Sequence, residues 1–445
     1  MNFVIESLWD LNLKPGGSML PKCRTEGDLY SIPKFEMAAQ DVEDFTGELR
    51  AFHHHFEDCF SRSEPRENFF RYMMGQFSAL ERKSIEPMAL HIEGGNVRSL
   101  QRFVSDVVWN QDLILTKYHE MVNEDLGDQE GALIFDETSF PKKGDESIGV
   151  ARQYCGTLGK IDNCQVGVFA AYASPQGYVL LDKRVFIPER WFSDRFQEKM
   201  KKCEAPDELS FRTKPQLAAE MLEEIARKKI LPFKYVVADS VYGDSPDFIN
   251  AVQKMIGVSY FVSINSQTLC WLRPPSVEKK KYKAGGKVRT KLLLLEKKDP
   301  VKVSDFAKPL NNFYWYKRTV SEGAKGPIAY EFTKRRVTLY EDGLPGKEVW
   351  LVVRRRKIDK KFEYSYFISN APLSTRLGRF VWLAGLRWAI EQCFEETKTE
   401  LGMDHYEVRK FRGWNQHMLI CIMAHFFLWH LKMCMEMQKG TTLRV

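Results

Sequence analysis

The chain has 445 residues, of which 44% are hydrophobic and 28% charged, so it can bury a large core and is not intrinsically disordered. Lysine and arginine outnumber aspartate and glutamate by 66 to 59, and the net charge of +7 permits a polyanionic partner without requiring one. The nine cysteines form no C-x-x-C pair and no zinc-ligand spacing, which favours reduced thiols in a cytoplasm over a disulfide framework.

Neither the N-terminal segment nor the most apolar stretch has the character of a membrane-targeting sequence. Residues 1–17 carry acidic residues early and lack an apolar run before a small-residue cleavage site, unlike a signal peptide. Residues 418–431 are too few to span a bilayer and include two histidines, so we expect a buried helix there. The sequence therefore predicts a cytoplasmic protein with no membrane partner.

Residues 1–125 are predicted to be mostly helical. An amphipathic helix is expected over 45–60, and we interpret its three consecutive histidines as surface or packing residues, because neighbours on a helix point in different directions. Further helices are expected over 69–92 and 97–107, joined by a glycine turn at 93–96. Two helices joined in this way are the unit from which helix-turn-helix modules are made.

Two arginines make this helical pair a candidate for DNA contact. Arg98 and Arg102 lie one turn apart on the second helix, opposite the side that carries Leu100 and Phe103. We predict that both arginines contact DNA. The alternative is an ordinary helical hairpin whose arginines are merely exposed.

Two predicted strands of residues 126–270 end on an aspartate. The apolar run over 132–135 is followed by Asp136, and the run over 234–239 ends on Asp239. Between them, the patterns predict a β-hairpin over 164–173 and 178–187, adjacent to the first strand, and then a helix over 214–229. After Asp239 we expect a loop, a helix and a strand, over 240–244, 246–255 and 260–264.

Residues 271–347 lose the helical periodicity of the preceding segments. Their runs alternate apolar with charged residues, which predicts half-buried antiparallel strands and hence a β-rich insertion. Two further strands are expected, over 349–354 and 363–368. Basic residues are dense at 278–298, 317–336 and 352–361. Such clusters are usually solvated faces, but beside a phosphodiester site they would contact phosphates.

The stretch 379–402 predicts one long helix, with apolar residues recurring at helical spacing. Arg387, Glu391 and Lys398 share another face, because at 3.6 residues per turn they lie within roughly 40° of one another. The ordinary explanation is a solvated face with one ion pair between residues four apart.

Asp136, Asp239 and Glu391 follow the order strand, strand, helix, which suggests the RNase-H-like fold, where such carboxylates converge. Two Mg²⁺ ions about 3.5–4 Å apart would then clamp a scissile phosphate and activate the attacking oxygen. Hard divalent cations prefer oxygen ligands, so carboxylates are the expected side chains. Aspartates at strand ends are common, so their position alone does not identify a site.

Three motifs resemble the DDE transposases of bacterial insertion sequences. They are FDETSF around Asp136, ADSVYGD around Asp239, and R-x3-E-x6-K formed by Arg387, Glu391 and Lys398. The resemblance covers about residues 65–435 and is closest to the subgroup with a Tyr-Arg-Glu-Lys signature and a β-rich insertion before the catalytic glutamate. Ala384 replaces the tyrosine of that signature, which leaves its usual DNA contact unfilled or filled from elsewhere.

The resemblance implies an α/β fold in which an RNase-H-like mixed sheet is flanked by helices and interrupted by the β-rich insertion. An all-helical DNA-binding region would precede it. The implied parts are the helical region 1–125, the first part of the catalytic core 126–270, the insertion 271–347, the second part of the core 348–417, and a C-terminal helix and tail 418–445.

The resemblance also implies roles for single residues. Asp136, Asp239 and Glu391 would be the catalytic residues and would bind two Mg²⁺ ions, for which Mn²⁺ would substitute. In relatives of this kind, a tryptophan of the insertion can stack on a flipped base. Trp315 is the candidate here, with a core position inside the insertion as the alternative. The expected DNA-binding residues are Arg387, Lys398, Tyr242, Trp315, Lys142, Lys143, Arg98 and Arg102.

The implied activity is that of a cut-and-paste DNA transposase. Such an enzyme binds the terminal inverted repeats of its insertion sequence, cleaves the ends and joins the 3′-hydroxyls to target DNA. We expect a homodimer in the DNA-bound complex, because two ends must be held together, and a cytoplasmic, nucleoid-associated location in a bacterium. The alternatives are a domesticated, non-catalytic DNA-binding regulator, against which the intact carboxylates argue, and an RNase-H-like nuclease without strand transfer.

Overall fold

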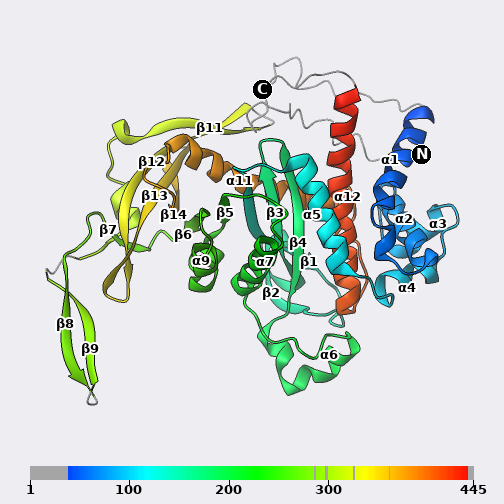
Figure 1. Ribbon diagram of the computed structural model, residues 1–445, viewed down its shortest axis with the longest axis horizontal. Helices are drawn as coiled ribbons and strands as arrows, with labels where there is room; N and C mark the ends of the chain where they lie inside the picture. The colour runs from blue at the N-terminus through cyan, green and yellow to red at the C-terminus, as the bar shows by residue number, and fades with distance from the viewer. Residues whose placement is uncertain (1–38, 285–286, 296–298, 324–325, 360, 439–445) are drawn as a thin grey trace. The chain divides into compact units, whose positions relative to one another are not determined.

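The computed structural model describes residues 39–284, 287–295, 299–323, 326–359 and 361–438. The chain divides into two compact units (Figure 1). The first comprises Met1–Lys234 together with Leu386–Val445, and the second comprises Tyr235–Gly385. The first unit is therefore made from both ends of the chain. The five-part division expected from the sequence uses other boundaries and stays a prediction.

Residues 39–126 are largely helical, as the sequence predicts. The elements are α1 (Ala39–His54), a 3-10 turn (Glu57–Cys59), α2 (Ser63–Gln76), α3 (Ile85–His91), α4 (Val97–Ser105) and α5 (Gln111–Leu126). The predicted continuous helix over 69–92 is wrong, because the chain leaves α2 after Gln76 and begins α3 at Ile85. Pro87 accounts for the new start, since proline has no N–H to donate and is tolerated in the first turn of a helix but not in its interior.

The sheet of the first unit is built around its longest strand, β3. Its strands are β1 (Ala132–Pro141), β2 (Ala151–Cys155), β3 (Lys160–Ser174) and β4 (Gly177–Phe186). β3 pairs antiparallel with each of the other three strands. The predicted hairpin, which corresponds to β3 and β4, is therefore confirmed, as is its position next to β1.

Asp136 does not end its strand, contrary to the prediction. β1 continues to Pro141, and Asp136 pairs with Phe169 in the middle of the ladder. Ser139 and Phe140 are buried, because the second half of β1 also pairs with β3. The local sequence does not reveal this partner. The carboxylate therefore projects from a continuous strand rather than from a loop.

The C-terminal helix α12 (Phe411–Gln438) is a central part of the core of the first unit. Residues 413–429 are all buried, and α12 packs against β4 and against helices α1, α2, α4 and α5 (Figure 1). This confirms the buried helix predicted over 418–431. Among the described residues, no helix has the length and apolar character needed to span a membrane. The unit also contains α6 (Gln197–Lys202) and α7 (Lys214–Lys228).

The second unit contains a mixed sheet and a separate two-stranded ribbon. Its strands are β5 (Tyr235–Ala238), β6 (Ser259–Ile264), β7 (Leu269–Trp271), β8 (Val277–Ala284), β9 (Lys287–Leu294), β10 (Val301–Lys302), β11 (Tyr316–Gly323), β12 (Gly326–Glu341), β13 (Leu344–Ile358) and β14 (Lys361–Ser369). The sheet order is β10-β7-β12-β13-β14-β6-β5, with β11 beside β12, while β8 and β9 pair with each other. β5 and β6 are parallel.

The described part of 271–347 is mainly strand, as predicted, with one short helix, α10 (Val303–Ala307), and a 3-10 turn, Asn312–Tyr314. The helices α8 (Ser240–Gly243) and α9 (Pro246–Gln253) connect β5 to β6. The prediction of a loop over 240–244 is wrong, because Asp239 caps α8 by accepting a hydrogen bond from the backbone N–H of Val241.

Helix α11 (Leu377–Thr399) leads from the second unit into the first. The apolar face that the sequence predicts is buried, with Phe380, Leu383, Leu386, Ile390 and Phe394 each at most 7% exposed. The helix ends at Thr399, before the predicted 402, and the chain then turns at Gly402. The φ of +67° at this glycine is one that larger residues rarely adopt.

Candidate active site

The orientation of Asp136 follows from the pairing of β1 with β3. Residues directly opposite each other in an antiparallel ladder project to the same face of the sheet. The partner of Asp136 is Phe169, whose ring packs against Phe394 of α11 at a centroid distance of 5.2 Å. The carboxylate therefore lies on the face that α11 covers. Its Oδ1 accepts a hydrogen bond of 2.9 Å from the backbone N–H of Glu137, and the side chain is 14% exposed.

Arg387 of α11 bridges the two predicted catalytic carboxylates of the first unit. Its Nη2 lies 3.8 Å from Oδ2 of Asp136 and 3.3 Å from Oε1 of Glu391. These two distances from one nitrogen mean that the two carboxylate oxygens are at most about 7 Å apart. A guanidinium between two carboxylates offsets their mutual repulsion.

The spacing of these carboxylates fits a centre with two metal ions. Such ions lie about 3.5–4 Å apart, and each is about 2 Å from its oxygen ligands. Two carboxylate oxygens within about 7 Å of one another can therefore bind on opposite sides of such a centre. Within the described residues, no cluster of three or more His, Cys, Asp or Glu side chains has the geometry of a metal site.

Asp239, the third predicted ligand, lies in the second unit, directly after β5, as the sequence predicts. The pKa of Asp244 is raised, first by burial and further by the charge of Asp239, although a hydrogen bond with the backbone of Asn265 lowers it. Asp239 and Asp244 therefore form a second acidic pair. Asp244 was not predicted from the sequence, although the motif ADSVYGD contains it together with Asp239.

The structure thus brings Asp136, Arg387 and Glu391 together in the first unit, and the convergence of Asp239 with them stays a prediction. With this geometry established, the comparisons with known proteins identify the family. The family model of the DDE superfamily endonucleases matches residues 55–327, which is more than half of the chain.

The chain belongs to the DDE endonuclease superfamily.

Two further comparisons concern individual proteins. This DDE endonuclease is similar to the probable transposase for insertion sequence element IS701 of Microchaete diplosiphon, with 26% identity over 350 residues that cover 77% of each chain. A cryo-EM structure of the piggyBac transposase synaptic complex with hairpin DNA covers 90% of this chain and 75% of its own, at 8% identity and a TM-score of 0.42. The resemblance to DDE transposases of insertion sequences is confirmed by the family match and the first relative.

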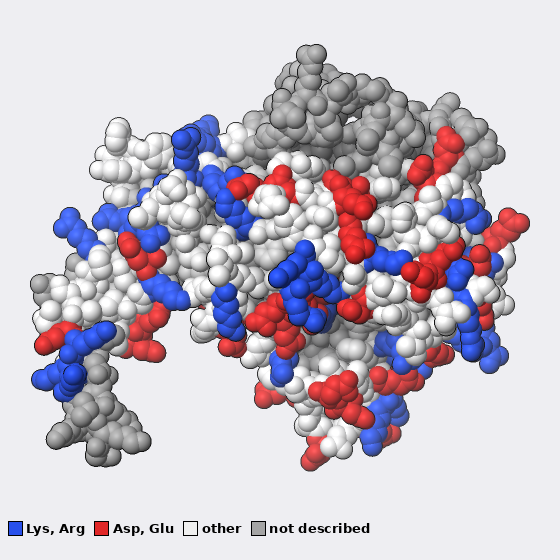
Figure 2. All heavy atoms as spheres, viewed as in Figure 1, with Lys and Arg blue, Asp and Glu red and all other residues white. Residues whose placement is uncertain are grey.

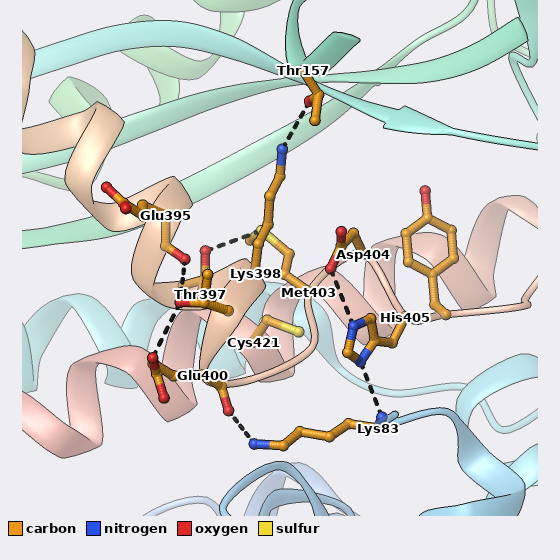
Figure 3. Close-up of polar contacts among 12 residues, drawn as sticks. Lys83, Thr157, Glu395, Thr397, Lys398, Glu400, Met403, Asp404, His405 and Cys421 are labelled. Atoms are coloured by element: carbon orange, nitrogen blue, oxygen red, sulfur yellow. Dashed lines mark hydrogen bonds and ion pairs between the residues drawn. The ribbon is translucent and has the colours of Figure 1, made fainter. Parts of the chain in front are cut away.

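In this DDE endonuclease, Lys398 connects α11 to β1. Its Nζ donates hydrogen bonds to Thr138 Oγ1 at 2.7 Å and to the carbonyl oxygen of Ser139 at 3.2 Å. It donates a third hydrogen bond to Thr157 Oγ1 at 3.2 Å (Figure 3). An ammonium group has three N–H donors, and these three bonds use all of them. Burial lowers the pKa of Lys398, while the charge of Asp404 opposes that effect. The side chain predicted to hold phosphate is therefore already engaged with the strand that carries Asp136.

The other glutamates near Glu391 have different surroundings. Glu391 has a side chain that is 57% exposed, so it is accessible to a substrate. Glu396 is buried, and its Oε2 lies 2.7 Å from Nε2 of His425 on α12. Glu395 is exposed. Glu396 therefore contributes to packing between α11 and α12, and only Glu391 approaches the guanidinium that also contacts Asp136.

The predicted DNA-binding residues of the first unit differ in their accessibility. Arg98 and Arg102 are exposed on α4, whose opposite side is buried. Lys143 is also exposed. Lys142 is half-buried, with its Nζ 3.4 Å above the ring of Tyr406 and a hydrogen bond of 3.1 Å to the carbonyl oxygen of the same residue. Burial lowers the pKa of Lys142 to about 8.

The predicted DNA-contacting side chains of the second unit, together with Ala384, are buried. Tyr242 is fully buried and packs against Phe248 at a centroid distance of 5.6 Å. Trp315 is 7% exposed, and the guanidinium of Arg355 lies 4.1 Å from its ring. The alternative given for Trp315, a core position in the insertion, describes this arrangement. Ala384, at the position of the signature tyrosine, is also buried.

The residues next to Trp315 are the exposed aromatics of this segment. Phe313, Tyr314 and Tyr316 are 83%, 56% and 51% exposed. Aromatic rings exposed to this degree on adjacent residues are unusual for a surface that only faces water. The sequence analysis selected the tryptophan from NNFYWYKR, and no pattern within these eight residues shows which rings point outward.

Lys83 is a further residue that the sequence analysis missed. It is 4% exposed, and its Nζ donates a 2.9 Å hydrogen bond to the carbonyl oxygen of Gln76, the last residue of α2. The same Nζ donates to the carbonyl oxygen of Glu400, just after α11 (Figure 3). One cation therefore binds the C-terminal ends of two helices, where the helix dipole is negative. No local pattern could indicate a partner 317 residues away.

Proposed function

We propose that this DDE endonuclease is a DNA transposase that binds the terminal inverted repeats of its insertion sequence, cleaves the ends and joins the 3′-hydroxyls to target DNA. The observation that supports this most directly is the cluster of Asp136, Arg387 and Glu391. Two carboxylates from a strand and a helix meet at one guanidinium, with a spacing that suits a two-metal phosphoryl-transfer site. In this proposal the catalytic core is RNase-H-like, and Asp239 completes the site.

Asp136, Asp239 and Glu391 would hold two Mg²⁺ ions, with Mn²⁺ as a substitute. When bound, the ions would stabilise the charge of the transferring phosphoryl group and favour deprotonation of the attacking hydroxyl. Arg387 has a second role in this scheme. Its planar guanidinium can donate two hydrogen bonds to the oxygens of one phosphate. Arg387 can therefore leave the two carboxylates and bind the DNA backbone once other positive charge lies near the carboxylates.

Lys398 acts mainly by positioning. Its bonds to Thr138 and Ser139 fix α11 against the segment of β1 that follows Asp136. This contact sets the distance between the strand carboxylate and Glu391, which lies two turns earlier on the same helix. A lysine at this place can still attract a nearby phosphate through its charge without giving up its hydrogen bonds.

End recognition is assigned to the N-terminal helices. α4 exposes Arg98 and Arg102 on one side and buries Leu100 and Phe103 on the other, as a helix that enters a DNA groove must do. Asn96 caps the helix by accepting a hydrogen bond from the backbone N–H of Ser99, so its first turn is fixed without a ligand. Two ends have to be held together, so the working form is a homodimer on DNA in the bacterial nucleoid.

The second candidate function is a nuclease of the same family that cuts without joining. The deciding experiment incubates the protein with end DNA, a target plasmid and Mg²⁺ or Mn²⁺, and scores cleaved and joined products separately. Glu391→Gln should abolish both products. Glu395→Gln, an exposed glutamate on the same helix, is the matched control and should retain both. Cleavage without joined product by the unmodified protein would favour the nuclease.

A further inference from the structure

The ribbon formed by β8 and β9 stands apart from the sheet of the second unit. The two strands have eight residues each and pair in register from Val277 with Leu294 to Ala284 with Lys287. They form a sheet of their own, and the ribbon extends away from β12, β13 and β14 (Figure 1). At about 3.4 Å per residue, eight residues extend for roughly 27 Å, which is the length of about eight base pairs of duplex DNA.

This ribbon is strongly basic. Between 277 and 294 the sequence has six lysines and one arginine against one glutamate, which gives a net charge of +6, compared with +7 for the whole chain. Lys279, Lys280 and Lys281 are exposed, and Figure 2 shows basic side chains gathered at the described base of the ribbon. The ribbon is therefore one of the strongly basic segments of the chain, and it is the one that projects from its sheet.

The pairing of the two strands also places lysines opposite each other. Lys280 pairs directly with Lys291. Like charges at directly opposed positions disfavour a ladder, and a two-stranded sheet is only marginally stable to begin with. Lysines on an exposed edge also prevent strand-to-strand aggregation, but mixed charges or a few lysines would achieve that. A net charge of +6 is better explained by a polyanionic partner.

We propose that the β8–β9 ribbon is an arm that binds the phosphate backbone of double-stranded DNA and takes no part in the cleavage chemistry. A two-stranded antiparallel ribbon fits the major groove of B-DNA, and lysines along it can contact the phosphates on both sides. This inference rests on the proposed function for the source of the DNA. It adds a second point of attachment, separate from α4, that contributes affinity and not sequence recognition.

The test is the salt dependence of binding to an end-DNA duplex. Replacing Lys279, Lys280 and Lys281 by Gln removes three potential phosphate contacts. The slope of log affinity against log salt concentration should become shallower by about 2.7, since each contact contributes about 0.9. If the variant and the unmodified protein bind equally at about 1 M salt, this difference in slope makes the variant bind roughly a hundredfold more weakly at about 0.15 M salt. Replacement of the same residues by Arg should preserve the slope.

Lys201, Lys202 and Lys308 provide a matched control, because they are also exposed lysines. Their triple Gln variant should change the slope by less than about one, as expected when no phosphate contact is lost. Circular dichroism and thermal unfolding check that each variant is folded. An unchanged salt slope in the ribbon variant would overturn the proposal, and so would an equally large loss of slope in the control variant. Tighter binding of the protein to single-stranded DNA than to duplex DNA would also overturn it.

The outcome can be separated from that of the proposed function. If the unmodified protein neither cuts nor joins, the transposase proposal fails, yet the salt slope still tests the arm. If it cuts and joins while the ribbon variant keeps the full slope, only the arm proposal fails.

Discussion

Lys83 offers the most direct test of how the N-terminal helices are connected to the catalytic helix. Lys83→Met keeps the aliphatic volume and removes the ammonium that binds the carbonyl oxygens of Gln76 and Glu400. Hydrogen bonds to a charged group contribute about 1.5–3 kcal/mol each, so the lost bonds amount to about 3–6 kcal/mol. The variant also avoids burying a charge, which offsets part of that loss.

The size of the offset follows from the pKa of Lys83. Burial lowers this pKa from 10.5 to about 8, against the charge of Glu400, and 2.5 pKa units correspond to about 3.4 kcal/mol. The side chain is 4% exposed, so solvent screening is small. The difference between the two terms is a net loss of at most about 2.6 kcal/mol in the free energy of unfolding.

The assay measures urea unfolding and end cleavage for Lys83→Met beside Arg82→Met. Arg82 is the adjacent residue and forms an ion pair with Glu407 in which both side chains are about two-thirds exposed. Exposed pairs contribute at most about 1 kcal/mol, so this control should lose little. Lys83→Met should also slow cleavage more than it weakens end binding, because it releases the end of α11 while leaving α4 in place. Equal stability and cleavage in the two variants would show that Lys83 does not hold α2 and α11 together.

The difference in stability between the unmodified protein and Lys83→Met should also change with pH in a known direction. The folded-state pKa of Lys83 is about 8, below its unfolded value of 10.5, so the unfolded chain binds more protons between these two values. The stability of the unmodified protein should therefore rise with pH across this window, relative to Lys83→Met, by up to about 1.4 kcal/mol per pH unit. A stability difference that does not change from pH 8 to 10.5 would contradict the burial of a charged Lys83.

Three further expectations concern the site and the insertion. Glu391→Gln should abolish cleavage while end binding stays equal or becomes stronger, since a negative charge near phosphate is removed; near-normal cutting would exclude Glu391 as a metal ligand. Arg387→Ala should make the salt slope of end binding shallower by about one, whereas Lys398→Ala should chiefly lower the unfolding free energy, measured in urea, because its donors bond β1. Phe313→Ala should weaken binding to DNA with an unpaired base at the cleavage end by about 1–3 kcal/mol, as loss of one stacking contact predicts. Trp315→Ala should instead destabilise the insertion. If Trp315→Ala alone weakened DNA binding and left thermal unfolding unchanged, Trp315 and not Phe313 would be the stacking residue.

Local periodicity and the three motifs were enough to predict several elements and the family of this protein. The apolar spacing of α11 predicted its buried face, and the short β-branched run before Asp239 predicted β5. The hairpin of β3 and β4 followed from two apolar runs around a turn. These predictions succeed because a helix or strand buries one face, and the apolar residues of that face recur at a fixed spacing along the chain. The three motifs likewise led to the family that the comparisons confirm.

The contact partner of each buried face, in contrast, follows from the folded structure and not from local sequence. Asp136 lies in mid-strand because β1 extends along β3, and Lys398 bonds that strand from a helix 260 residues away in sequence. Lys83 binds the ends of two helices, and Trp315 is covered by Arg355 while Phe313 remains exposed. Periodicity reports that a side chain is buried or exposed, but not the group it contacts. Hydrogen bonds and ion pairs between distant segments depend on geometry that forms only when the whole unit has folded, so no local pattern encodes them.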